Sequence, residues 1–523
     1  MKRWFAISGL FVTALAAACG SSPHPQDGAA PSSGRKFDGA STPDSTGDVG
    51  RAGSDASLVD VASTGGAGAG GATATGTGGA GGSDTGLASG GVPASDGPPA
   101  SGGTSTTDGP PATGSPDARN TRDATGGTGP GGTAGTTGVA GPADNVAAVT
   151  VDNGLPGIGY LNGLFATVTV CVPGTSQCQN IAHVLVDTGS VGLRLLGSVL
   201  TLSLPVLAND SGVALAQCTQ FVSGFTWGPL RSADFKIAGE QVSNLAIQVI
   251  EESSYPVPSD CTGLASNSAD TLGANGILGV GSFLQDCGSA CAAPIGARSA
   301  NPGLYYACSS TKRGGCVASA VPVPKQLSNP VALFSQDNNG VIIELPAIAA
   351  NGAPSVTGSL VFGIGTRDNN GLGQETVIPL DQSATFLTKY PANGKNALAF
   401  VDSGSNAIYF LDSRTTSIPT CSGMYSYFYC PRSTMSLSAT SQDVGGSVTV
   451  AMTFSIANAQ TLFSSKNNVA FANLGGTGSD SSSGSSGLGS YFDWGLPFFF
   501  GKNVFSAIEG QSTPAGTGPF VAF

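Results

Sequence analysis

Short runs of β-branched and aromatic residues recur along residues 147–523, and glycine, asparagine, proline and serine separate them. Such runs at short intervals are typical of strands. The predicted strands are 164–172, 234–237, 245–250, 341–345, 359–362 and 447–454. No long stretch keeps the 3.6-residue period of an amphipathic helix between capping residues. The pattern therefore predicts an all-β fold. Residues 172–177 are predicted to be a hairpin loop that is closed by the cysteines on either side of it, Cys171 and Cys178.

Two of the apolar runs lead into the same kind of acidic turn. Within 183–196 an apolar run ends in Asp187-Thr-Gly-Ser and a second apolar run follows, and the same order recurs around Asp402-Ser-Gly-Ser within 398–411. A buried strand that delivers one acid to a hydroxyl-rich turn is unusual, and its repetition indicates that the two acids meet. Similar sequences elsewhere, at Asp84 and Asp210, lack the apolar flanks and are expected to be ordinary turns.

A second pair of segments supports a duplication. Residues 275–281 and 495–501 follow the first and the second acid, and both are apolar and end in a glycine. We expect both to be strands, including the phenylalanines 498–500, with the glycine allowing another backbone to pass closely. The chain is therefore predicted to hold an N-terminal β lobe at 147–345 and a C-terminal β lobe at 346–523.

The first eighteen residues have the pattern of an export signal. Two basic residues precede an apolar segment that is too short to span a bilayer as a mature helix, so we expect 1–18 to be a signal peptide. Cys19 follows three alanines and is expected to be lipidated, with ordinary cleavage and release as the alternative. Gly20 gives no signal for retention at an inner membrane. We therefore expect an exported outer-membrane or cell-surface lipoprotein, or otherwise a periplasmic or secreted protein.

The segment after the signal has a different composition. Residues 20–144 are mainly Gly, Ser, Thr, Ala and Pro, with almost no aromatic residues. Such a chain cannot bury enough apolar area to offset the entropy of ordering it. We expect 19–146 to be a disordered, lipid-anchored, low-complexity linker. The anchor would be the protein's contact with the membrane, because no later segment is long and apolar enough to span it.

Cysteine usage agrees with export. Of the eleven cysteines, ten lie in the region predicted to fold, an even number as a disulfide framework requires. Spacing along the chain suggests five pairs, while the sequence leaves other pairings open. The suggested pairs are Cys171–Cys178, Cys218–Cys261, Cys287–Cys291, Cys308–Cys316 and Cys421–Cys430.

Several classes of function are disfavoured. A net charge of −12 and a pI of about 4.5 argue against nucleic-acid binding. We expect no metal site, because no CxxC pair is present and the folded region holds one histidine, and we expect no cofactor. A serine or cysteine triad needs a histidine, but His24 lies in the linker and His183 is expected to be a strand residue.

Two facing aspartates provide a different chemistry. Carboxyls about 3 Å apart cannot both ionise, so they share one proton and can act as base and acid on one water molecule. Glycines after each acid let the backbone turn, and the hydroxyls beside each acid can orient the carboxylates by hydrogen bonds. The expected site comprises the acids Asp187 and Asp402 and the supporting residues Thr188, Gly189, Ser190, Ser403, Gly404 and Ser405.

On these motifs, residues 147–523 resemble the pepsin-like aspartic proteases. Asp187 and Asp402 match the catalytic acids of that family, and Thr188 and Ser403 match its hydroxyl grip between the lobes. Residues 276–280, 358–363 and 494–509 resemble the segment that completes the first acid's loop, the opening strand of the second lobe and the closing segment. The ending also resembles a group of bacterial exported proteins known only as a domain of unknown function.

The resemblance implies a two-lobed fold with an active-site cleft between the lobes and a flap over it. The family's flap carries a tyrosine, whereas the matching segment, 217–228, offers Phe221, Phe225 and Trp227. We select Phe221 as the residue in the tyrosine's place. The hydroxyl contact of the family's flap is therefore missing from this chain.

Together these features predict an aspartic endopeptidase that acts on peptide or protein substrates at acidic to mildly acidic pH. We expect it to be a monomer. The alternative is a catalytically inactive cell-envelope lipoprotein that binds peptides or polymers in the same cleft.

Overall fold

The computed structural model describes residues 144–523 except 252, 297–300, 310–314, 392–393 and 479–490. The predicted signal peptide 1–18, the lipidation site Cys19 and the linker as far as residue 143 lie outside the described residues. Among the described helices, none is both long enough and apolar enough to cross a membrane.

Strands are the dominant regular structure of the described residues, as predicted. The largest sheet has fifteen strands. In spatial order they are β10 (Cys316–Ala318), β9 (Tyr305–Cys308), β5 (Ala214–Phe221), β6 (Gly224–Ile237), β7 (Glu240–Ile250), β4 (Val191–Leu196), β8 (Gly276–Val280), β3 (Cys178–Asp187), β2 (Gly163–Cys171), β1 (Val146–Asp152), β12 (Val356–Phe362), β11 (Gly340–Leu345), β21 (Lys502–Ala507), β24 (Phe520–Ala522) and β13 (Val377–Pro379).

A second sheet lies within the C-terminal half and has seven strands. In spatial order they are β18 (Thr449–Ile456), β17 (Met435–Gln442), β14 (Phe386–Lys389), β15 (Asn396–Asp402), β20 (Tyr491–Gly495), β16 (Ile408–Phe410) and β19 (Gly475–Gly476). A two-stranded ribbon joins β22 (Ser512–Thr513) to β23 (Gly516–Thr517). The described α-helices are short: α1 (Ala269–Leu272), α2 (Ser289–Ala292), α3 (Ser413–Thr416) and α4 (Ala459–Ser464).

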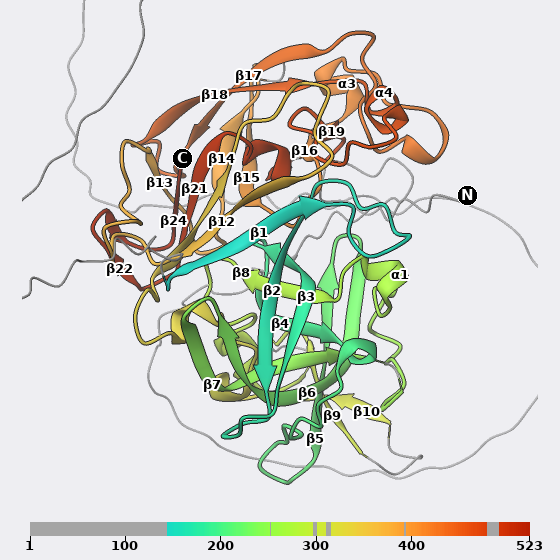
Figure 1. Cartoon of the computed structure of the whole chain (residues 1–523), viewed down its shortest axis with the longest axis vertical. Coiled ribbons are helices and arrows are strands. Elements are labelled where there is room, and N and C mark those ends of the chain that lie inside the picture. The colour runs from blue at the N-terminus through green and yellow to red at the C-terminus, as the bar shows by residue number, and fades with distance from the viewer. Residues whose placement is uncertain (1–143, 252, 297–300, 310–314, 392–393, 479–490) are drawn as a thin grey trace, which may run out of the picture. The chain divides into compact units, whose positions relative to one another are not determined.

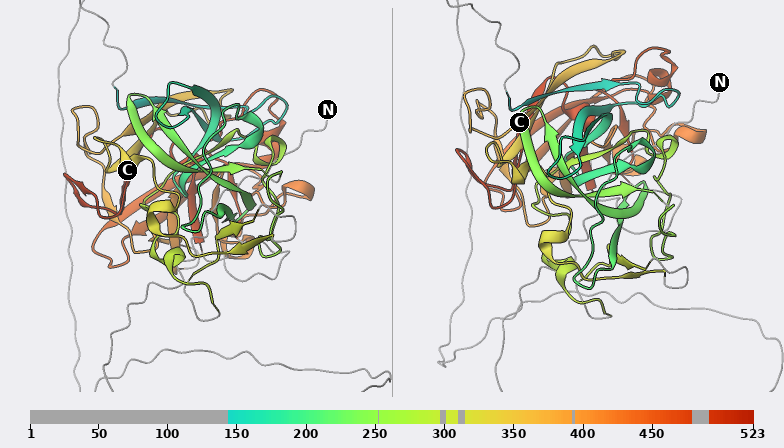
Figure 2. Two further views of the ribbon diagram at one scale, coloured as in Figure 1. Left: turned by 90° about the horizontal axis from the view of Figure 1, so that it is seen from below. Right: turned by 60° about the horizontal axis from the view of Figure 1, so that its bottom comes forward.

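These strands form two lobes that share a layer. In Figure 1 the strands of the N-terminal half gather below β1 and those of the C-terminal half above it. Strand β1 pairs with β2 on one side and with β12 on the other, so the two halves are joined by backbone hydrogen bonds. The chain end is part of this layer, because β24 pairs with β21 and β13, and Figure 2 shows it lying against the folded body. The fold is all-β and two-lobed.

The lobe limits predicted from the sequence fall at strand pairs in this shared layer. Strand β1 begins one residue before the predicted start at 147, and Asn145 already donates a hydrogen bond to the Phe362 carbonyl (3.0 Å). The predicted limit at 345/346 lies between β11 and β12, which pair with each other. The shared layer therefore contains strands from both sides of that limit.

All six predicted strands fall on observed strands, although β6 begins ten residues before the predicted start at 234 and β7 five residues before the predicted start at 245. The predicted hairpin loop joins β2 to β3, and the Cys171–Cys178 disulfide closes it. The interpretation of 495–501 as a strand is wrong: the strand there is β20, which ends at Gly495, and Leu496–Phe498 is a 3-10 turn. Proline at 497 removes a backbone donor from the run, and its phenylalanines are buried as core residues of a turn rather than of a strand.

A continuous apolar core joins the two halves, and disulfides crosslink the chain within each half. One cluster of buried residues contains side chains from both lobes, including Val186 beneath the first acid and Trp494 beside the second. The described residues form five disulfides, with the same partners that the spacing suggested: Cys171–Cys178, Cys218–Cys261, Cys287–Cys291, Cys308–Cys316 and Cys421–Cys430. Such a set is typical of extracellular or periplasmic proteins.

Candidate active site

Each aspartate stands at the end of a buried strand that runs parallel to a second strand. Asp187 ends β3 and lies opposite Gly279 of β8, while Asp402 ends β15 and lies opposite Gly495 of β20. A Cβ atom on Gly279 would lie 2.6 Å from the Val191 nitrogen, so a side chain there would push away the turn that follows the first acid. A Cβ atom on Gly495 would meet backbone after the second acid in the same way. The two halves thus use one construction to deliver one acid each.

The two acid turns face one another. An ideal Cβ on Gly189 would lie 2.8 Å from Cγ of Asp402, and one on Gly404 would lie 2.7 Å from Oδ1 of Asp187. Each glycine therefore leaves the space that the carboxyl group of the other lobe fills. The two carboxyl groups are close enough for each to influence the pKa of the other. This is the meeting of acids that the repeated motif predicts.

Hydroxyl groups beside the acids bind the two turns together reciprocally. The Thr188 nitrogen donates to Oγ of Ser403 (3.1 Å), and the Ser403 nitrogen donates to Oγ1 of Thr188 (2.9 Å). Each hydroxyl then donates to a carbonyl of the opposite strand, Thr188 to Val401 (3.1 Å) and Ser403 to Val186 (2.8 Å). Four hydrogen bonds between the lobes therefore fix the separation and angle of the two acid turns.

Within each turn, a glycine and a serine orient the carboxyl group. The Gly189 nitrogen donates to Oδ1 of Asp187 (2.8 Å), and the Ser190 hydroxyl donates to Oδ2 of the same side chain. The second turn repeats this arrangement around Asp402. There the Gly404 nitrogen donates to Oδ1 and the Ser405 hydroxyl to Oδ2, both at 2.8 Å.

Burial dominates the electrostatics of the pair. Both Asp187 and Asp402 are 0% exposed. Loss of solvation raises the pKa of Asp187, although the hydrogen bonds from Ser190 and Asp402 oppose this. Loss of solvation, and then the charge of Asp187, raise the pKa of Asp402 well above its usual range. The pair is therefore set to hold one proton in common, because both charges cannot be sustained so close together.

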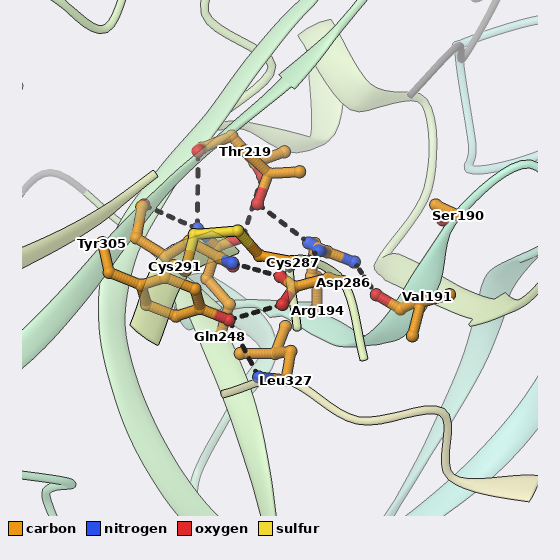
Figure 3. A network of polar contacts seen from close by, with 12 residues as sticks. Ser190, Val191, Arg194, Thr219, Gln248, Asp286, Cys287, Cys291, Tyr305 and Leu327 are labelled. Carbon is orange, nitrogen blue, oxygen red and sulfur yellow. Dashed lines mark hydrogen bonds and ion pairs between the residues drawn. A yellow bond between two sulfur atoms is a disulfide. The ribbon is translucent and has the colours of Figure 1, made fainter. Parts of the chain in front are cut away.

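A buried arginine lies on the strand that follows the first acid turn, and Figure 3 shows its polar partners. Arg194 of β4 is 1% exposed, and its Nη1 donates to the Val191 carbonyl (2.7 Å). Its Nε donates to Oγ1 of Thr219 (3.2 Å), and its Nη2 pairs with Oδ2 of Asp286 (3.4 Å). Among the influences on the pKa of Asp187, the charge of Arg194 is a small one that lowers it. The arginine thus links the first acid turn to the β5–β6 hairpin.

Asp286 has further partners that tie the same hairpin to the rest of the lobe. Tyr305 donates its hydroxyl to Oδ1 of Asp286 (2.6 Å), and the Gln217 amide donates to Oδ2. The Tyr305 oxygen in turn accepts a hydrogen bond from the Leu327 nitrogen (2.9 Å). Burial raises the pKa of Asp286, while Arg194 opposes the shift.

The three aromatic residues predicted for the flap lie on this hairpin but point to different places. Phe221 packs in an apolar cluster with Leu185 of β3, which carries the first acid, and Ile277 of the adjacent β8. The centroid of its ring lies 5.9 Å from Cζ of Arg194. Phe225 and Trp227 belong to a separate cluster around the Cys218–Cys261 disulfide. Of the three, Phe221 is the one associated with the acid strands, as selected from the sequence.

The structure brings together the two acids and their six supporting residues, and it separates them from the Asp210 turn. Around the first and second acids, the sequence analysis missed the buried residues Arg194 and Asp493, and Asp286, whose side chain is 6% exposed. Arg194 and Asp493 each interrupt an apolar run, which was a visible signal. Over the described residues, no group of His, Cys, Asp and Glu has the arrangement of a metal site.

The fold and the paired acids define a two-lobed, all-β protein with an aspartate dyad at the junction of its lobes. The chain belongs to the family described as "Protein of unknown function (DUF3443)", which matches residues 141–523 and confirms the resemblance to a group of unknown function. No curated protein matches the sequence. Among solved structures, "Crystal structure of aspartic proteinase from Irpex lacteus" is similar, with 16% identity, coverage of 72% of this chain and 96% of that chain, and a TM-score of 0.42.

Proposed function

We propose that the protein is an aspartic-type endopeptidase in which Asp187 and Asp402 activate one water molecule for hydrolysis of a peptide bond. The observation that carries the proposal is the mutual fit of the two turns, in which each glycine leaves space for the opposite carboxyl group. The reciprocal hydroxyl bonds between Thr188 and Ser403 support it, because they hold the two carboxyls in a fixed relation. Preorganised groups of this kind are what acid–base catalysis requires.

In the proposed mechanism the ionised member of the pair removes a proton from water as the oxygen attacks the peptide carbonyl. The protonated member gives its proton to the carbonyl oxygen, which becomes a hydroxyl of the tetrahedral intermediate. The resting pair holds one proton in common, because burial raises the pKa of both carboxyls. Collapse of the intermediate breaks the C–N bond. The leaving nitrogen takes the proton that the base had removed from water, and a hydroxyl of the intermediate gives its proton to the other carboxylate, which restores the pair.

Substrate access is part of this proposal. Both acids are fully covered, so a peptide reaches them only when the covering residues move apart. The β5–β6 hairpin is the element that we propose moves. Its turn, at Val222 and Ser223, is partly exposed, and Phe221 at the end of β5 packs beside the acid strands.

Complete burial of the acids is also the observation that favours the second candidate. In that case the same junction is structural, the dyad is a buried hydrogen-bonded pair, and the protein is an inactive envelope lipoprotein that binds peptide or polymer between the lobes. The two candidates differ in whether a peptide bond is broken, which an assay settles.

The test is cleavage of an unfolded protein substrate by the purified full chain between pH 2 and pH 8, with products identified by mass spectrometry. The wild type is compared with Asp187→Asn and Asp402→Asn, and Asp210→Asn is the matched control because it carries the same Asp-Ser-Gly pattern in an exposed turn. We expect cleavage by the wild type and Asp210→Asn only. Cleavage by all four proteins, or by none, favours the binding candidate.

The cellular location is a further part of the proposal. Five disulfides support an oxidising compartment, and we propose that a lipid on Cys19 attaches the protein to an outer membrane or cell surface. Growth with a labelled fatty acid should label the wild type and leave Cys19→Ala unlabelled. Equal labelling of both proteins would contradict the anchor.

A further inference from the structure

A third buried carboxyl group, that of Asp493, adjoins the acid pair. Asp493 lies within β20 and is 1% exposed. In the parallel pairing with β15 it stands opposite Phe400, while Asp402 stands opposite Gly495, and β16 places Tyr409 opposite it on the other side. Paired residues share a face of a sheet and alternate residues return to it, so the side chains of Asp493, Asp402 and Tyr409 project from the same face.

The fold does not require an acid at this place. In the first lobe the corresponding position of the strand beside the acid is Ile277, which pairs with Leu185 two residues before Asp187. Ile277 is fully buried in an apolar cluster, and Asp493 occupies its counterpart in the second lobe. Burying a carboxyl instead of an isoleucine costs free energy unless the group is neutral or satisfied. Because a buried carboxyl stands beside the strand of Asp402 and not beside the strand of Asp187, we infer that Asp493 has a role at Asp402.

The Ser405 hydroxyl interacts with both Asp402 and Asp493. It donates to Oδ2 of Asp402 (2.8 Å), and it is near enough to Asp493 to lower the pKa of that carboxyl. The Asp493–Ser405 geometry nevertheless falls short of a hydrogen bond, and neither Asp493 oxygen has a hydrogen-bond partner among the described residues. A buried carboxyl without partners is stable only as the neutral acid, which has a proton to donate.

The other titratable groups that face Asp493 are acidic. They are Asp402 at the end of β15, Asp187 at the end of β3 and the phenol of Tyr409 on β16, with Tyr160 beside that phenol. Burial, and then the charge of Asp187, raise the pKa of Asp493 well above its usual range. No lysine or arginine is among the groups that shift it in the described structure. The buried cation Arg194 lowers the pKa of Asp187 instead, and it forms an ion pair with Asp286.

We propose that Asp493 is a third carboxyl of the acid centre, a positioning residue that carries its own proton at acidic pH and acts on Asp402 through Ser405. As the neutral acid it donates toward the Ser405 oxygen and so keeps the Ser405 hydroxyl directed at Asp402. Once Asp493 is ionised, its negative charge opposes the ionisation of Asp402. The pair of Asp187 and Asp402 therefore keeps its shared proton up to a pH closer to neutral. The catalytic part of this inference rests on the proposed function, whereas the proton on Asp493 does not.

The first test measures that proton without using catalysis. Unfolding of the full chain by urea is followed from pH 5 to pH 6, where folded Asp493 is proposed to keep its proton. The wild type and Asp493→Asn are compared with the control Asp210→Asn, whose exposed carboxyl has a pKa lowered by Lys325. A group that is protonated when folded and ionised when unfolded makes the unfolding constant rise about tenfold per pH unit. We expect the wild type and Asp210→Asn to rise about tenfold more per pH unit than Asp493→Asn. Equal slopes in all three would overturn the proposal.

The second test is the pH dependence of cleavage. Asp493→Asn keeps the shape of the neutral acid but cannot ionise, so its activity should disappear at a pH lower by at least about half a unit than that of the wild type. One pKa unit corresponds to a tenfold change in proton affinity. Asp493→Ile, which copies Ile277, should show the same displacement. An unchanged upper limit in both variants would overturn the link to Asp402. If the wild type cleaves nothing, the proposed function fails, while the unfolding slopes still decide whether Asp493 carries a proton.

Discussion

At the scale of single residues, the acid centre depends on two glycines, whose lack of a side chain leaves room for the opposite carboxyl group. Gly189 and Gly404 leave the volume into which the opposite carboxyl group fits, with ideal Cβ positions 2.8 Å from Cγ of Asp402 and 2.7 Å from Oδ1 of Asp187. A contact below 3.0 Å displaces one of the two groups. The two acids meet only because neither turn carries a methyl group at this point.

We predict that Gly189→Ala and Gly404→Ala each lower cleavage by about 10²-fold, because displacement of a catalytic group by about 1 Å has an effect of that order. Gly371→Ala is the matched control, since its Cβ would meet nothing within 4 Å. Steady-state rates on a peptide substrate provide the measurement. If both site variants retain wild-type rates, the close approach of the two turns has no catalytic importance.

The sequence predicts the residues of the two acid turns but not the charged residues around them. The tetrapeptides repeat, and their apolar flanks distinguish them from the turn at Asp210. Arg194 and Asp493 each stand in an otherwise apolar run, where periodicity favours a core residue. What makes them stable is their partners and neighbours from other strands, and no local pattern specifies those.

At the scale of elements, a polar network joins the strand after the first acid to the β5–β6 hairpin. Arg194 on β4 bonds Thr219 on β5, and Asp286 accepts hydrogen bonds from Gln217 on β5 and from Tyr305 on β9. The ion pair between Arg194 and Asp286 is almost fully buried. Loss of one partner of such a pair leaves a charge without compensation.

We predict that Arg194→Met lowers the free energy of unfolding by about 3–5 kcal/mol, the usual cost of removing one partner of a buried ion pair. The double variant Arg194→Met/Asp286→Leu should be destabilised by less than the sum of the two single changes, because it removes both charges. A double-mutant cycle from urea unfolding measures this. Additive effects would show that the two residues do not stabilise each other.

The strand that accompanies the second acid shows where pattern reading fails at this scale. The apolar run after Gly495 has the composition of a buried strand, yet the strand ends at that glycine and a 3-10 turn follows. The true strand, β20, contains Asp493 and borders residues outside the described part of the chain. Asp402 pairs with Gly495 as Asp187 pairs with Gly279, and this equivalence defines the register of β20 against β15. The sequence alone does not reveal it, because it depends on which strands lie side by side.

At the scale of the whole molecule, a second acidic cluster joins segments from both halves. Arg367 donates through Nε to Oδ2 of Asp337 (2.6 Å), and its Nη2 lies 3.6 Å from Oε1 of Glu240 at the start of β7. Burial, and then the hydrogen bond and charge of Asp337, raise the pKa of Glu240 to about 7. One arginine thus serves two buried acids, and a proton on Glu240 reduces the repulsion between them.

We predict that stability declines as pH rises toward neutrality. A carboxyl whose pKa is higher in the folded state contributes stability that is complete below its unfolded value, and this contribution is lost as pH rises through the folded value. For Glu240 the window lies between 4.5 and about 7. The melting temperature of the wild type should fall across it, and Glu240→Gln should reduce the fall. A variant with the wild-type decline would exclude Glu240 as a contributor.

The most direct test of the central claim is the pH–rate profile of peptide cleavage by the full chain, measured for the wild type, Asp187→Asn and Asp402→Asn. The account predicts a bell-shaped profile with its maximum at acidic pH, since the pair acts only while it holds one proton. Both variants should lose the activity at every pH. Cleavage that persists in either variant, or the absence of cleavage by the wild type between pH 2 and pH 8, would contradict it.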